Sequence, residues 1–275
     1  MRRALSTEQL VTWVTRALWI GLAFTVALDV SRPVAVVLWT AWAVVVVATL
    51  VTHPVSLTAL RVAAPASVLA ALAAASPVAV GWAVGTAAVV YSPALGLAHV
   101  NGSAYPNERR FPLRLPGQLL FAAPLAWLLL VGVPAAALVA AERDAIAISG
   151  VLGLAAVGLG VVLARALHRL SRRWLVFVPA GVVLHDHLAL ADPVLFVRQT
   201  VAHVAAAEEG TDALDLTLAS PGLALELRLR ETTELGRRVA GRAVGDALSA
   251  DAVLFTPTRP GAVLREAAAR RLPTA

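Results

Sequence analysis

The sequence predicts an α-helical membrane bundle of about six transmembrane helices in residues 1–173, followed by a small β-rich domain with a C-terminal helix in residues 174–275. Hydrophobic residues make up 59% of the 275 residues and charged residues only 15%, which is far from the composition of soluble domains. Apolar runs of about 20 residues, the length that a bilayer core requires, recur through the first part. After Trp174, apolar residues recur at every second position, which is typical of half-buried strands.

Six apolar segments, separated by charged, proline or glycine residues, fit the length of a spanning helix. The third is the weakest, because Arg61 lies near its start and Pro65 lies inside it. In the fourth, Tyr91-Ser92-Pro93 indicates a kink or a polar pocket. The residues from His99 to Gly117 break the apolar pattern and are expected to form a loop. The predicted spans are Leu10–Leu28, Val34–Thr52, Leu57–Ala75, Val78–Ala98, Gln118–Ala141 and Ala145–Leu167.

The charge differs between the two parts. Residues 1–173 carry 13 arginines and five acids, whereas residues 174–275 carry 10 arginines and 12 acids. The basic excess therefore belongs to the loops of the apolar part, where it argues for contact with anionic lipid and against nucleic-acid binding. The chain has no cysteine, which excludes disulfides, thiolate metal sites and thiol catalysis.

The arginines also predict an orientation. With six spans, ten arginines of residues 1–173 fall on one side, and the other side holds only Arg32 and Arg143 among the loop residues. Because basic loops stay in the cytosol, both termini and the loop from His99 to Gly117 are expected there, in a multi-pass protein of a bacterial cell membrane.

Short alternating segments predict the strands of the second part. Its charge balance predicts that residues 174–275 fold alone, with a core of Leu175, Phe177, Val182, Leu184, Leu216, Leu218, Leu225, Leu227 and Leu229. The predicted strands are Trp174–Pro179, Gly181–His185, Val194–Gln199, Val201–Ala206, Ala213–Ala219, Leu223–Leu229 and Ala252–Phe255, and Ala262–Leu272 is the predicted helix.

Seven short strands and a closing helix resemble a bacterial pleckstrin-homology-like domain. Residues 107–114 (NERRFPLR), 172–181 (RRWLVFVPAG) and 254–261 (LFTPTRPG) look like a group of polytopic membrane proteins from GC-rich bacteria that carry such a domain at the C-terminus. The resemblance covers most of the chain and implies no activity, cofactor or site residue.

Candidate chemistry is sparse. His185-Asp186-His187 is the one compact set of metal-ligand types, but alternation puts Asp186 on the opposite face of a strand, and a polar strand end explains it as well, unless His203 joins. Ser103, with His99 and Glu108, lacks the Gly-x-Ser-x-Gly elbow of a hydrolase. No catalytic, cofactor or metal residue is predicted. The candidate contacts for anionic lipid or an acidic partner are Arg109, Arg110, Arg114, Arg169, Arg172 and Arg173.

These observations favour a membrane scaffold or adaptor whose β-rich domain binds a cytosolic protein or the anionic inner leaflet. A channel or small-molecule permease is the first alternative, and it would need a polar lining that the spans lack. A membrane enzyme acting on lipid at the cytosolic face is the second, and it would need a base beside the loop arginines. Arg16 and Arg61 lie near enough to the cytosolic boundary to reach it with their guanidinium groups.

Overall fold

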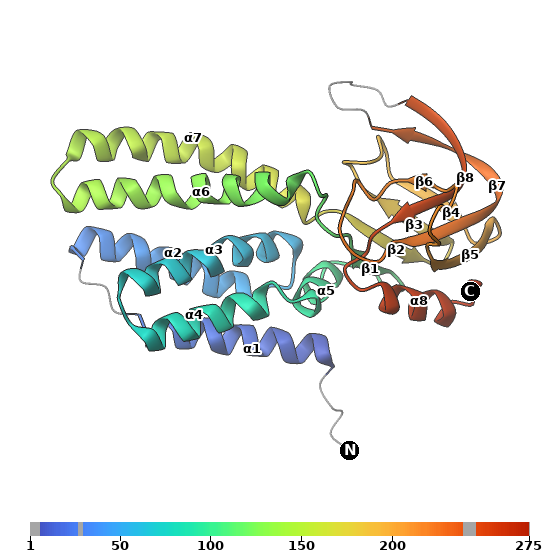
Figure 1. The fold of residues 1–275 in the computed structure, drawn as a ribbon. Helices are drawn as coiled ribbons and strands as arrows, with labels where there is room; N and C mark the ends of the chain where they lie inside the picture. The colour runs from blue at the N-terminus through green and yellow to red at the C-terminus, as the bar shows by residue number, and fades with distance from the viewer. Residues whose placement is uncertain (1–5, 27–29, 239–245, 275) are drawn as a thin grey trace, which may run out of the picture. The chain divides into compact units, whose positions relative to one another are not determined.

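The computed structural model describes residues 6–26, 30–238 and 246–274, which fall into two compact units. The helical unit comprises Met1–Ser103 and Ala122–Ser171, and the β-rich unit comprises Ala104–Phe121 and Arg172–Ala275. The predicted division at residue 173 therefore differs from the compact units at one segment, because residues 104–121 belong with the strands. The α6–α7 hairpin is consequently an insertion within the sequence of the β-rich unit (Figure 1).

The helical unit contains α1 (Thr7–Leu22), α2 (Arg32–Leu50), α3 (Pro54–Ala73), α4 (Pro77–Val90), α5 (Pro93–Asn101), α6 (Leu119–Glu142) and α7 (Ile146–Leu170). Its helix starts follow from local sequence. Ser6 and Gln9 form a reciprocal capping box at α1. The next four helices each carry proline in the first turn, where no amide hydrogen is needed.

Within the described residues, four helices are long and apolar enough to cross a membrane: α2, α3, α6 and α7. The third predicted span is thus a continuous helix despite Pro65. The fourth is not continuous, because Tyr91 and Ser92 end α4 and Pro93 opens α5, and the pair is bent by 55°. If α4 and α5 together are counted as one broken span, the number of candidate spans in the described residues rises from four to five. α1 has 16 residues, fewer than its predicted span.

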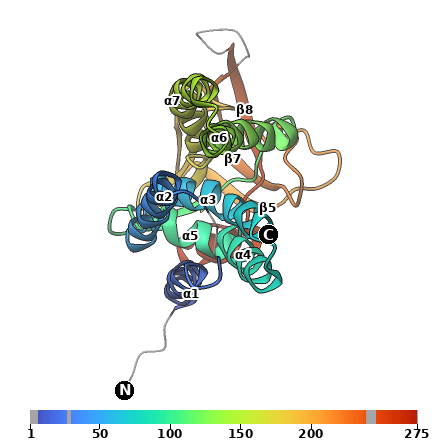
Figure 2. The same cartoon turned by 90° about the vertical axis from the view of Figure 1, so that its left-hand side faces the viewer.

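Small side chains let the helices of this unit approach closely. Ala64 and Ala71 of α3 and Ala79 and Ala83 of α4 are fully buried, and Trp19 of α1 packs in the same cluster. α6 and α7 lie side by side at the opposite edge of the helical unit from α1 (Figures 1 and 2).

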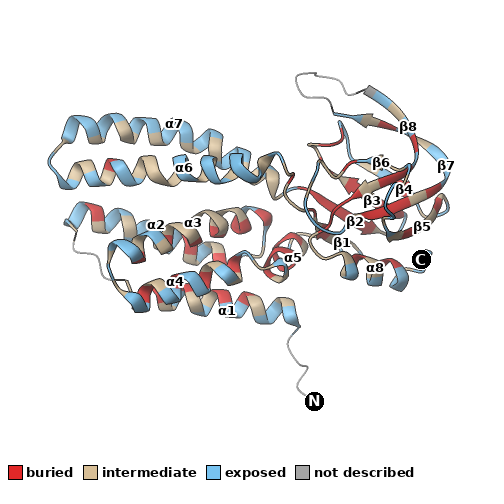
Figure 3. Ribbon diagram, viewed as in Figure 1, coloured by how far each residue is buried: buried red, intermediate tan, exposed pale blue. Residues whose placement is uncertain are grey.

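Apolar side chains cover the outside of α6 and α7. Only Ala137 of α6 and no residue of α7 is buried, although both helices are strongly apolar (Figure 3). Phe121 is 87% exposed and Leu154 is 78% exposed. An apolar surface of this length is unfavourable in water and favourable in hydrocarbon.

The β-rich unit consists of two four-stranded sheets and one helix. The first sheet has the order β1 (Arg109–Pro112), β2 (Trp174–Val178), β3 (Gly181–His185), β4 (Val194–Val197), with antiparallel pairs. The second has the order β5 (Val201–Ala206), β7 (Leu225–Arg237), β8 (Asp246–Phe255), β6 (Leu214–Asp215), with β6 parallel to β8. Helix α8 (Pro260–Ala269) follows.

The strand predictions hold for β2, β3 and β5, and β7 and β8 are longer than predicted. Eight of the nine predicted core residues are buried. The exception is Leu218, which has a positive φ of 54° and lies in an irregular stretch after β6. The loop prediction for residues 99–117 is wrong in two places: His99–Asn101 continues α5, and Arg109–Pro112 is a strand.

Candidate functional site

Two of the candidate arginines, Arg109 and Arg110, lie on strand β1, in a segment that the sequence predicts to be a loop. β1 pairs antiparallel with β2, so that Phe111 faces Leu175 in the register and is buried against Phe177, with ring centroids 5.7 Å apart. Arg110 forms an ion pair of 2.9 Å with Glu108, and its guanidinium lies 5.3 Å from the centre of the Trp174 ring. Arg109 and Arg110 are therefore presented by the edge of a sheet.

Arg173 has a structural role that removes it from the candidate contact set. Its Nε and Nη2 donate to the two Asp186 carboxylate oxygens at 2.7 and 2.6 Å, and its Nη1 donates to the Arg114 carbonyl at 2.7 Å. Arg173 is 2% exposed, so its charge is neutralised inside the fold and does not reach a ligand.

Three other candidate arginines differ in exposure. Arg114 packs against Gly222, where a Cβ would lie 2.8 Å from the Arg114 Nε, so the missing side chain of the glycine leaves room for the guanidinium; this Nε is buried. Arg169 in the last turn of α7 and Arg172 before β2 are exposed. Of the six candidate arginines, Arg169 and Arg172 are therefore the two whose side chains are most exposed to solvent.

The alternative sites from the sequence do not assemble. Asp186 is engaged by Arg173, and within the described residues no group of three metal-ligand side chains is found. His203 lies 4.0 Å from Glu226, beside other strands than His185. Glu108 forms an ion pair with Arg110, and His99 lies in α5 with its Nδ1 at the Leu95 carbonyl.

Charged groups on the second sheet form a network around Arg228. Its guanidinium donates to Glu226 and to Asp212, each at 2.7 Å. Burial alone would raise the pKa of Glu226, but the hydrogen bonds from Thr211 and Arg228 outweigh burial and lower it. The Arg228 hydrogen bond also lowers the pKa of Asp212. This network keeps its carboxylates charged, and the arrangement suits sheet stability more than proton transfer.

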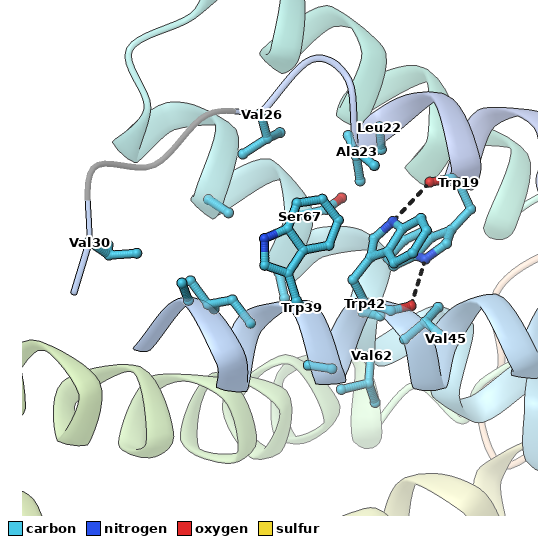
Figure 4. A pocket seen from close by; sticks show the side chains of 16 residues that line it. Trp19, Leu22, Ala23, Val26, Val30, Trp39, Trp42, Val45, Val62 and Ser67 are labelled. Carbon is cyan, nitrogen blue, oxygen red and sulfur yellow. Dashed lines mark hydrogen bonds between the residues drawn. The ribbon is translucent and has the colours of Figure 1, made fainter. Parts of the chain in front are cut away.

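An apolar cavity of about 560 Å³ lies among α1, α2 and α3 and was not anticipated from the sequence (Figure 4). Trp19 and Trp42 form one wall, and each indole N–H donates to the other residue's carbonyl, at 3.4 and 3.2 Å. Trp39 packs edge-on against Trp42. Among the described lining residues, Ser67 contributes the one hydroxyl and donates it to the Ala64 carbonyl, so the described lining is largely apolar. The sequence feature that could have indicated this cavity is the presence of tryptophans in two adjacent apolar segments.

Comparison with known proteins gives no relative: no family model, no curated protein and no solved structure matches the chain.

Proposed function

We propose that this protein is an integral membrane scaffold or adaptor that holds its β-rich unit at the cytosolic surface of a bacterial cell membrane. The observation that carries the proposal is the connection between the two units. The chain passes between them three times, at Ser103–Ala104, at Phe121–Ala122 and at Ser171–Arg172. Three covalent connections to apolar helices would confine the β-rich unit to the membrane surface, where a partner or the anionic leaflet is bound.

The proposed topology uses six spans: α1, α2, α3, the bent pair α4 and α5, α6 and α7. The exposed apolar faces of α6 and α7 support their contact with lipid. The arginine distribution supports a cytosolic location for both termini and the β-rich unit. We propose that the β-rich unit is a pleckstrin-homology-like domain, to which the segment before α6 adds β1.

The cavity supports anchoring over transport. A permease or channel needs polar or charged groups along its path, because polar solutes must exchange their hydration for protein contacts. Among the described residues that line this cavity no side chain is charged, and the one hydroxyl is already bonded. The pairing of Glu108 with Arg110 weighs against the lipid-enzyme alternative, because this carboxylate next to β1 is already engaged.

The topology predicts an all-or-none labelling pattern in a chain that has no native cysteine. Asp144, between α6 and α7, and Glu209, after β5, are both exposed. We expect an impermeant maleimide to label Asp144→Cys in intact cells and to label Glu209→Cys only after the membrane is opened. Labelling of Glu209→Cys in intact cells would contradict the cytosolic placement of the β-rich unit.

The exposed arginines predict a preference for anionic lipid. A basic residue near an anionic surface contributes about 1 kcal/mol, or roughly fivefold in affinity. We expect the double change Arg169→Gln with Arg172→Gln to lower severalfold the association of spin-labelled phosphatidylglycerol relative to phosphatidylcholine. Arg32→Gln with Arg143→Gln removes the same charge from exposed positions on the proposed outer side. An equal loss in both double variants would show a general charge effect and no cytosolic contact.

A further inference from the structure

A cluster of cationic side chains lies inside the helical unit at one end of its helices. It contains Arg16 of α1, Arg61 of α3 and His99 of α5, with Tyr91 at the break between α4 and α5. Arg16 donates from Nε and Nη2 to the Thr49 and Leu50 carbonyls at the end of α2, at 2.9 and 3.3 Å. Arg16 therefore lies at the end of α2, and Arg61 lies about two turns inside α3.

Arg61 packs within the bundle. A methyl group on Gly96 of α5 would lie 3.1 Å from one of its terminal nitrogens, so the guanidinium rests on the α5 backbone. The Tyr91 ring centre is 5.9 Å from this guanidinium, and the Tyr91 hydroxyl donates to the Arg61 carbonyl at 2.8 Å. The Arg61 Nε is buried and has no hydrogen-bond partner. This position differs from that of an arginine that only extends its guanidinium to the membrane boundary.

His99 supplies a second unsatisfied nitrogen. The side chain is 1% exposed, and its Nδ1 lies 3.1 Å from the Leu95 carbonyl. A carbonyl only accepts hydrogen bonds, so Nδ1 carries a proton and Nε2 is the atom that remains, buried and without a partner. Gly96 and His99 are three residues apart on one face of α5, which brings Arg61 and His99 to the same face.

The charges around this cluster are of one sign. Arg61 and Arg16 are the charged groups that act on His99, and among the described residues no carboxylate pairs with Arg61. Arg61 is partly buried, with its Nε fully buried, and a partly buried cation without a counter-charge is unfavourable, so a bound anion would stabilise it. A guanidinium offers forked donors that match two phosphate oxygens, and a phosphate beside His99 would favour the protonated ring, whose Nε2 then donates.

We propose that Arg61 and His99 bind a phosphate group, and that this phosphate belongs to the headgroup of an anionic phospholipid. The inference rests on the proposed membrane location, but it needs neither the orientation nor a partner of the β-rich unit. Phospholipid is favoured over free phosphate because Arg16 of this cluster lies at the end of α2, and the ends of spanning helices reach the headgroup level.

The test measures the melting temperature of the delipidated full-length protein in a neutral detergent. Dioleoyl-phosphatidylglycerol should raise it in a saturable manner, whereas dioleoylglycerol, with the same chains but no phosphate, should not. Equal stabilisation by both would assign the effect to acyl chains and overturn the proposal. Stabilisation by inorganic phosphate with none by phosphatidylglycerol would overturn the lipid source.

Arg61→Gln should weaken the phosphatidylglycerol response at least tenfold in midpoint concentration, without lowering the melting temperature of the lipid-free protein, because it removes an unpaired, partly buried charge. Arg165→Gln, at an exposed position of α7, is the matched control and should leave the response unchanged. If Arg61→Gln does not fold, His99→Gln should show the same weakening. An unchanged midpoint in the folded variant would overturn the site. Membrane extraction of the same variants reports separately on the proposed membrane anchoring.

Discussion

Replacing Asp186 with asparagine is expected to destabilise the β-rich unit by about 3–5 kcal/mol, because it leaves the buried Arg173 charge without its carboxylate partner. Arg173 and Asp186 are each 2% exposed, and the Arg173 guanidinium donates two short hydrogen bonds to the Asp186 carboxylate. The same carboxylate accepts from the Leu188 amide at 3.1 Å, so it also holds the turn after β3.

Hydrogen exchange in the full-length protein measures this effect. The expected destabilisation corresponds to a loss of about two to four powers of ten in the protection of the β2 and β3 amides. Glu231→Gln, at an exposed position of β7, is the matched loss of one carboxylate and should leave protection within about 0.5 kcal/mol of wild type. Equal protection in the two variants would contradict a structural role for the ion pair.

A double change tests whether the two residues act as a pair. Replacing a buried ion pair with apolar residues of similar volume is often neutral or stabilising. Arg173→Met together with Asp186→Leu should therefore restore part of the protection that Asp186→Asn loses. A double variant that is less stable than Asp186→Asn would show that the hydrogen bonds to the Arg114 carbonyl and the Leu188 amide outweigh the charge.

The elements that the sequence predicted well are those whose pattern is local. Long apolar runs located the long helices, and short apolar runs bounded by turn residues located β2, β3 and β5. β1 was missed because Arg109, Arg110 and Pro112 are typical of loops. These residues are accepted at the edge of a sheet, where charges face solvent and a missing amide hydrogen is harmless.

The candidate site was predicted less well, because its geometry depends on residues far apart in the sequence. Arg173 looked like one more basic residue after the last span, and its partner Asp186 lies 13 residues away. Arg61 of α3 lies against Gly96 of α5, far away in the sequence, and α5 follows a 55° bend at which the sequence indicated only a kink. Charge counts therefore identified the basic end of the bundle, but they could not separate the structural arginines from those available to a ligand.

The segment before α6 determines whether the β-rich unit can fold alone. The sequence suggested that residues 174–275 suffice, but this fragment lacks β1 and Arg173. Loss of Phe111 removes a buried aromatic side chain, which costs about 3–5 kcal/mol, and loss of Arg173 leaves Asp186 unpaired at a similar cost. Leu113 and Arg114 also donate backbone hydrogen bonds, to the carbonyls of Arg173 and Thr256. These losses approach the whole stability of about 5–15 kcal/mol of a typical domain.

We therefore expect residues 174–275 to lack a cooperative thermal transition, and we expect a shortened protein that keeps β1 to show one. In the shortened protein, residues 104–117 are joined to residues 172–275 by a glycine-serine linker of about ten residues, which spans roughly 18 Å. Such a linker is long enough because Pro112 and Trp174, which lie close to the two residues that it joins, are paired across β1 and β2. Circular dichroism and amide NMR dispersion distinguish the two proteins. Phe111→Ala in the shortened protein should lower its stability by about 3–5 kcal/mol, whereas a cooperative transition in residues 174–275 would show that β1 is dispensable.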